Sequence, residues 1–172
     1  MELGFWEVLW MVCGVVTVIA AVLAHRGRNW RYLGRAVTGV LFLIGGALVH
    51  VINLATGVGY AGFADPAHFD WVTDAWRSVV APNEVLFIGL LAAFEAAVGV
   101  LVLSGKRRTR VGYNAVIAFY VALWIFGWFE TVWVAIMLPA MLLLLRAELR
   151  AETAPGSLAA TEGKHLAGVG NR

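Results

Sequence analysis

The sequence predicts an all-α membrane protein, a polytopic bundle of five transmembrane helices with a short amphipathic helix on its outer side. Hydrophobic residues make up 61% of the 172-residue chain and charged residues only 14%, whereas a soluble domain carries about 25% charged residues. Several apolar runs come close to the roughly 20 residues that a spanning helix needs. The basic residues gather in the segments after alternate runs, as in multi-pass membrane proteins.

The first three spans follow continuous apolar runs over residues 5–24, 36–54 and 85–104. A fourth run, residues 111–145, would be about 53 Å long as a single helix, at about 1.5 Å per residue. Because a hydrocarbon core is only about 30 Å thick, this run must turn. Its one charge is Glu130, close to Gly127, and we expect this glutamate to face water at the turn. The run is therefore predicted to form two helices, over residues 111–127 and 131–146.

We expect a retained helix at the start of the sequence and a polar tail at its end. The first span begins MELGFWEV, with two glutamates and no base, whereas a signal peptide begins with a basic segment. We therefore interpret it as a retained helix, and cleavage near Ala24 is the alternative. Residues 147–172 are mostly small, polar or charged, so we expect a disordered tail.

The basic residues indicate the topology. Twelve of the thirteen lysines and arginines follow the first, third or fifth span, and only Arg77 lies on the opposite side. The three clusters are Arg26, Arg28, Arg31 and Arg35; Lys106, Arg107, Arg108 and Arg110; and Arg146, Arg150, Lys164 and Arg172. The positive-inside rule predicts that these segments are cytoplasmic in the cell membrane, with the N-terminus outside and the C-terminus inside. Their positions give no support to nucleic-acid binding.

The long outer loop between the second and third spans contains a helical pattern. Asp65 followed by Pro66 is typical of a helix start, and Pro82 of a helix end. Between them, four apolar residues recur at helical spacing: Phe69, Val72, Trp76 and Val79. We predict an amphipathic helix over residues 66–80 that seals the mouth of the bundle. The alternative is a lid that binds a partner protein through Phe69, Trp71 and Trp76.

Glu95 lies in the middle of the third span, in the stretch GLLAAFEAAVGVLVL. An ionised carboxylate is unfavourable there, so we expect an uncharged acid that faces the bundle interior. Small or apolar residues share its helical face and favour close helix approach: Ile88, Ala92, Gly99 and Val102. From their depth, Thr17, Asn114 or Tyr120 are its candidate hydrogen-bond partners. Glu95 is then a proton relay, a polar anchor for a quinone or lipid head group, or an interhelical hydrogen bond.

His50 lies near the outer end of the second span, on a helical stripe with Gly39, Leu43, Gly46 and Asn53. A histidine here is a haem or metal ligand, a proton carrier, or a hydrogen-bonded residue of helix packing. A metal site needs three or four ligands, and among the other histidines only His68 falls on the same side of the membrane. We therefore favour the packing role, and the sequence predicts neither a metal site nor a catalytic residue.

Two stretches carry a family resemblance. In RYLGRAVTGVLFLIGGALVH, an arginine is followed by a glycine, a phenylalanine and a small pair; in LFIGLLAAFEAAVGVLVLSGKRRTRVG, a glutamate precedes a glycine, and a leucine-rich end leads to a basic turn. These stretches resemble the first two helices of the DoxX-like family of small integral membrane proteins. The resemblance covers about residues 31–146 and implies a four-helix membrane bundle, to which this chain adds an N-terminal helix. Glu95 is the residue that matches the family's motif.

The resemblance also implies a role within larger assemblies. DoxX-type proteins include small subunits of a thiosulfate:quinone oxidoreductase, members of oxidoreductase assemblies for thiol and oxidant defence, and distant eukaryotic chaperones for channels. We expect an accessory, non-catalytic subunit that contacts membrane lipids and packs on other integral membrane subunits or on itself. An oxidoreductase that handles quinone or thiosulfate and a transporter of small solutes or protons are the alternatives. Candidate residues for binding a quinone or lipid, or for handling protons, are Glu95, His50, Asn53, Asn114 and Tyr120.

Overall fold

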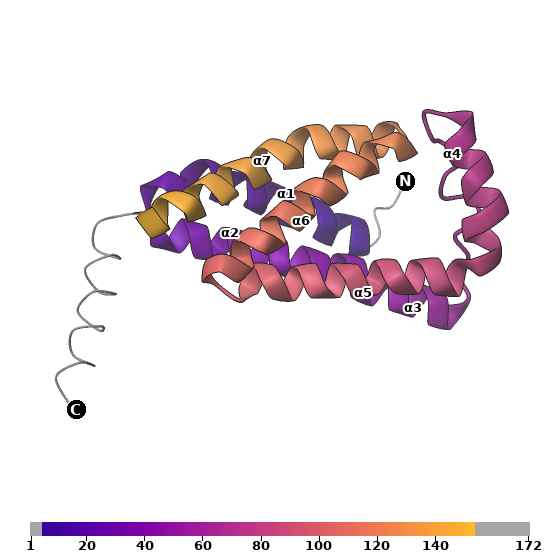
Figure 1. Cartoon of the computed structure of the whole chain (residues 1–172), viewed down its shortest axis with the longest axis horizontal. Coiled ribbons are helices and arrows are strands. Elements are labelled where there is room, and N and C mark those ends of the chain that lie inside the picture. Colours follow the sequence, from indigo (N-terminus) through magenta and orange to yellow (C-terminus); the bar gives the residue numbers. More distant parts are fainter. Residues whose placement is uncertain (1–4, 154–172) are drawn as a thin grey trace, which may run out of the picture.

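A computed structural model of the chain describes residues 5–153, with side chains from Val8 onward. The described part consists of helices and turns without strands, and five of its helices are long and apolar enough to cross a membrane. The helices lie alongside one another as a bundle (Figure 1). The predicted fold class, an all-α polytopic helix bundle, is confirmed.

Five membrane-crossing segments form the bundle. The first is α1 (Phe5–Leu23), which ends in the 3-10 turn η1 (Ala24–Arg26). The second is a continuous helix made of α2 (Arg28–Val40), the π-helical segment η2 (Leu41–Leu48) and α3 (Val49–Thr56). The other three are α5 (Glu84–Leu103), α6 (Lys106–Leu123), which ends in the 3-10 turn η5 (Trp124–Phe126), and α7 (Trp128–Thr153).

Several helices begin before, or end after, the apolar runs that identified them. The second segment begins at Arg28 rather than residue 36, and α6 begins at Lys106 rather than residue 111. Hydropathy marks the part of a helix that suits hydrocarbon, whereas arginine and lysine themselves are good helix formers. The helices therefore continue through their basic ends.

The end of α7 differs most from expectation, because the helix reaches Thr153 although we expected a disordered tail from residue 147. Glu148, in this part of α7, is only 4% exposed. Arg35 Nε donates a hydrogen bond to its Oε1 at 2.7 Å, and Arg35 Nη2 bonds its other oxygen. This buried ion pair fixes the last turns of α7 against α2. The rest of the expected tail, residues 154–172, lies outside the described part of the chain.

The described members of the three basic clusters lie at one end of the bundle. The turn after α1, the α5–α6 turn and the last turns of α7 come together there (Figure 1). Besides the Arg35–Glu148 pair, Arg110 Nη2 lies 3.2 Å from Glu152 Oε2 and joins α6 to α7. We call this the basic end. The opposite end carries the long loop and the η5 turn.

The outer helix is shorter than predicted and begins later. It comprises α4 (Asp70–Ala75), the π-helical segment η3 (Trp76–Val80) and the 3-10 turn η4 (Ala81–Asn83), and Phe69 rather than Asp65 is its N-cap residue. Asp65 lies among turns, and its Oδ1 accepts a hydrogen bond from Arg77 Nη2 at 2.8 Å. From η4 the chain enters α5 directly, so α4 and η3 lie across the end of the bundle (Figure 1).

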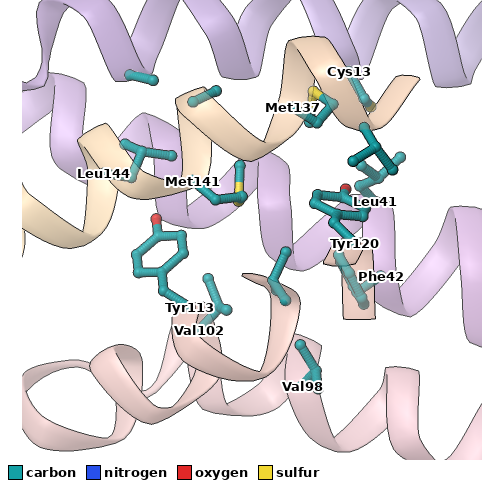
Figure 2. Close-up of a cluster of buried hydrophobic side chains, with 14 of the residues drawn as sticks. Cys13, Leu41, Phe42, Val98, Val102, Tyr113, Tyr120, Met137, Met141 and Leu144 are labelled. Atoms are coloured by element: carbon teal, nitrogen blue, oxygen red, sulfur yellow. The ribbon is translucent and has the colours of Figure 1, made fainter. Parts of the chain in front are cut away.

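The best-packed core lies between α6, α7 and their neighbours. Met137, Met141 and Leu144 on α7 are fully buried, and Figure 2 shows them on the side of α7 that faces Tyr113 and Tyr120 of α6. A second, smaller cluster joins the outer helix to the bundle through Tyr60, Ala64, Val72, Trp76 and Ile88. The outer helix is thus attached by its buried apolar side, as the interpretation of a helix that seals the bundle mouth requires.

Candidate ligand-binding cavity

The small-residue stripes of the second segment and of α5 face each other. A Cβ atom added at Gly99 would lie 2.6 Å from Leu43 Cγ and 3.2 Å from the carbonyl oxygen of Gly39. A Cβ added at Gly46 would lie 2.6 Å from Glu95 Cδ and 2.7 Å from each carboxyl oxygen. Because Gly46 has no side chain, the Glu95 carboxyl lies directly against the backbone of η2.

Glu95 is buried and faces the bundle interior, where His50 is its nearest ionisable neighbour. Glu95 Oε2 lies 3.4 Å from His50 Nε2, which is longer than the usual range for a hydrogen bond to nitrogen. Within the described residues this oxygen has no hydrogen-bond partner. The two groups therefore face each other without a strong bond between them.

The other face of His50 is held by the outer loop. His50 Nδ1 lies 2.7 Å from the Tyr60 hydroxyl, and Asn53 Nδ2 donates to the same hydroxyl oxygen at 3.0 Å. The Tyr60 oxygen accepts the hydrogen bond from Asn53, and the one hydrogen of the hydroxyl remains to be placed. We assign this O–H as the donor to His50 Nδ1. This assignment leaves the hydrogen of His50 on Nε2, the ring nitrogen that lies 3.4 Å from Glu95 Oε2.

Tyr60 also connects this group to the outer helix. Its backbone N–H donates to Glu84 Oε2 at 3.1 Å, and its carbonyl oxygen accepts a hydrogen bond from Trp76 Nε1 at 2.7 Å. Burial raises the pKa of the Tyr60 phenol above its ordinary value of 10.0, so the hydroxyl stays neutral. The loop, the outer helix and His50 are thus positioned through one residue.

A cavity of about 430 Å³ opens beside Glu95 and His50. Its volume lies within the range of about 300–1,000 Å³ that is usual for small-molecule sites. The wall is mainly apolar and aromatic, with residues that include Trp10, Phe42, Leu91, Phe119, Phe126 and Trp133. Both π-helical segments, η2 and η3, contribute to it, and such irregular turns occur frequently at functional sites.

Four ionisable side chains line this cavity: His50, Glu95, Tyr120 and Glu130. Glu130 was expected to face water, but it is only partly exposed, and its Oε2 is buried without a hydrogen-bond partner among the described residues. Glu95 Oε2 is likewise buried without a hydrogen-bond partner among the described residues. A buried carboxyl oxygen without a partner is unfavourable by about 1–3 kcal/mol. A ligand that offers hydrogen-bonding groups would remove this penalty at both glutamates.

The structure brings some of the sequence-predicted residues together and separates others. Glu95, His50 and Tyr120 line the cavity, and Asn53 supports it through Tyr60. Asn114 is exposed, and its Nδ2 donates to the carbonyl oxygen of Arg110, away from the cavity. Thr17, another proposed partner of Glu95, is buried, and its hydroxyl has no partner among the described residues.

The predicted interaction residues of the outer helix also differ in position, because only one of them lines the cavity. Trp76 is buried and lines the cavity, whereas Phe69 and Trp71 are exposed, Trp71 by 64%. His68 Nε2 lies 2.7 Å from Thr131 Oγ1, in a separate contact between the loop and α7. Residues 5–153 contain no group of three or more histidine, cysteine, aspartate or glutamate side chains that could hold a metal ion.

Sequence reasoning missed Tyr60, Gly46 and Glu130 as parts of this site. Gly46 stood on the predicted stripe, and Glu130 was the one charge in its long apolar run, so both carried a weak signal. Tyr60 carried none, because its role depends on the path of the loop across the bundle mouth.

Fold and site together define a multi-pass membrane helix bundle with a mainly apolar internal cavity that contains carboxyl groups. No protein-family model matches the chain, and no significant similarity was found to a curated protein or to a solved structure. The resemblance to the DoxX-like family therefore stays a prediction.

Proposed function

We propose that the protein binds a ring-shaped amphipathic molecule of the quinone class in the cavity beside Glu95. The observation that carries this proposal is that Glu95, whose buried Oε2 has no hydrogen-bond partner among the described residues, lines a cavity with a largely aromatic wall. Aromatic walls suit a flat ring, which they contact by stacked or edge-to-face packing. The cavity has the size of a small-molecule site, which favours a ring-shaped head over a lipid with two acyl chains.

The polar groups suit both redox forms of such a ligand. A quinone carbonyl accepts hydrogen bonds, which the Nε2–H of His50 and an uncharged Glu95 carboxyl are able to donate. A quinol hydroxyl donates instead, and Glu95 or Glu130, each with an Oε2 that has no partner within residues 5–153, is able to accept. Binding alone needs no electron transfer within this chain, so the proposal is consistent with a non-catalytic subunit.

The wider role that we propose is that of an accessory subunit of a larger membrane complex, with the basic end in the cytoplasm. The resemblance to the DoxX-like family supports the first part and the positive-inside rule supports the second. Phe69 and Trp71 are exposed on the outer helix, which makes this surface available to another membrane subunit. A quinone- or thiosulfate-linked oxidoreductase and a transporter are the alternatives, and neither is favoured by a specific observation.

The binding proposal is tested with protein purified from its native membrane in mild detergent. Solvent extraction and mass spectrometry should recover a quinone in about equimolar amount. Short-chain quinones should bind the ligand-free protein. Glu95→Leu, which removes both the donor and the acceptor, should weaken this binding about 2- to 10-fold, because a hydrogen bond between uncharged groups contributes about 0.5–1.5 kcal/mol.

A matched pair of variants locates the site. Leu91→Trp places a larger side chain on the cavity wall, whereas Leu90→Trp adds the same group at a position that is 60% exposed on the outside of α5. Binding should be lost in the first variant and kept in the second. Equal affinities of the two variants, or extraction of phospholipid alone, would overturn the proposal.

A further inference from the structure

The basic end of the bundle contains a second hollow, of about 400 Å³. It lies between the turn that joins α1 to α2 and the last turns of α7. Its polar wall consists of basic side chains: His25, Arg28, Arg31, Arg146 and Arg150. No acidic residue lines it within the described part of the chain. We call it the basic hollow.

The two acidic residues in the last turns of α7 lie away from the hollow. Glu148 binds Arg35 and Glu152 pairs with Arg110, so both carboxylates lie on the sides of α7 toward α2 and α6. Arg146 and Arg150 are four residues apart and share the helix face toward the hollow. Between residues 5 and 153, none of the four arginines of the hollow forms an ion pair with a carboxylate.

The floor of the hollow is apolar and continues along the membrane-facing surface. Ala21, Val22, Leu143 and Ala147 form part of the floor. Toward the middle of the bundle, exposed apolar side chains extend from Val22 along α1 and from Leu143 along α7 at helical spacing: Val15, Ile19, Val132 and Ile136. A charged recess thus leads directly onto two parallel apolar stripes.

We propose that the basic hollow binds the phosphate of an anionic phospholipid, whose acyl chains lie along the apolar stripes of α1 and α7. Guanidinium groups match phosphate oxygens with paired hydrogen bonds, and basic pockets between membrane helices bind anionic head groups. A free phosphate shares the charge but gains nothing from the stripes, which is why we assign the lipid. The site lies at the opposite end from the cavity and does not depend on the quinone proposal.

The test uses the full-length protein in detergent, with phosphatidylglycerol and phosphatidylcholine titrated separately and bound lipid counted by native mass spectrometry. One phosphatidylglycerol should bind more tightly than the others and more tightly than phosphatidylcholine. In Arg146→Gln/Arg150→Gln this affinity should fall roughly 30-fold, about 2 kcal/mol at 1.4 kcal/mol per tenfold change, as two interfacial arginines are expected to contribute.

The matched control is Arg107→Gln/Arg108→Gln, which removes the same charge from exposed positions at the same end of the bundle but outside the hollow. It should keep the tight lipid. An equal loss in both double variants would show diffuse attraction to the basic end and overturn the site. Equal binding of both lipids, or displacement of phosphatidylglycerol by millimolar inorganic phosphate, would also overturn the assignment.

Discussion

The ion pair between Arg35 and Glu148 offers the sharpest test of the fold, because it fixes a part of α7 that hydropathy does not identify. The perturbation is Arg35→Gln, which leaves the Glu148 carboxylate without its partner. The Glu148 side chain is 5% exposed and that of Arg35 15%. Arg35 also lies over the Tyr32 ring, with Cζ 5.1 Å from the ring centroid, so the arginine has a second favourable contact and the glutamate does not.

The low exposure of both side chains determines how much unfolding free energy each variant should lose. Removing one partner of a buried ion pair destabilises a protein by about 3–5 kcal/mol, because the remaining charge is buried without compensation. Arg35→Gln should reach the upper part of this range and Glu148→Gln the lower part. The double variant leaves no unpaired charge, so its free energy of unfolding should lie within about 1 kcal/mol of wild type. The two single losses sum to at least about 6 kcal/mol, so the coupling between the two positions is about 5 kcal/mol or more.

The assay is reversible unfolding in detergent micelles, followed by circular dichroism, for wild type, both single variants and the double variant. Arg77→Gln is the control, because the Arg77–Asp65 pair has side chains that are 61% and 50% exposed. An exposed pair contributes about 0–1 kcal/mol. If Arg35→Gln destabilised the protein no more than Arg77→Gln does, the assignment of a buried, ordered end of α7 would be refuted.

Two further predictions concern helix packing and the bundle mouth. A Cβ at Gly112 would lie 2.7 Å from Val102 N, a backbone atom that is unable to move alone, so Gly112→Ala should destabilise the protein by about 1–3 kcal/mol. The control is Gly89→Ala, where a Cβ would meet nothing within 4 Å, and this variant should be neutral or stabilising. Equal unfolding free energies of the two variants would contradict the prediction. Tyr60→Phe should destabilise by about 1–3 kcal/mol through the lost bonds to His50 and Asn53. Because burial raises the pKa of Tyr60 above 10.0, its stabilising effect is complete below pH 10 and is lost as the pH rises through the folded-state pKa. The variant should lack this alkaline loss in an unfolding titration, and an unchanged loss would contradict the assignment.

The helix bundle was predictable because its determinants are local in the sequence. Spanning helices follow from apolar length, and the basic segments share one end because an even number of crossings, two, separates each from the next. The outer helix was predicted in kind but not in position. Asp65 and Pro66 match a helix start, yet Asp65 pairs with Arg77 and the helix begins at Asp70. Tertiary contacts overrode the local signal.

The approach of His50 to Glu95 was not predictable from depth along the helices. Depth places residues at one level but does not determine how each helix is rotated, and the π-helical segment η2 changes the rotation between Gly39 and His50. The same uncertainty explains why Asn114 was predicted as a partner of Glu95, although it lies at a suitable level but on an exposed face of α6. The ion pair of Glu148 was missed for a different reason, since a polar sequence carries no sign of a distant arginine.

The geometry around Glu95 bears on whether this residue is a structural hydrogen bond between helices or part of a site. A structural hydrogen bond would place the carboxyl in direct contact with a donor on the next helix. Instead, Oε2 stays 3.4 Å from His50 Nε2, and the carboxyl is pressed against the backbone at Gly46. His50 is held in turn by Tyr60 on its other side. Packing thus fixes both polar groups at the wall of a cavity with unused hydrogen-bonding capacity, which is the arrangement that a ligand would complete.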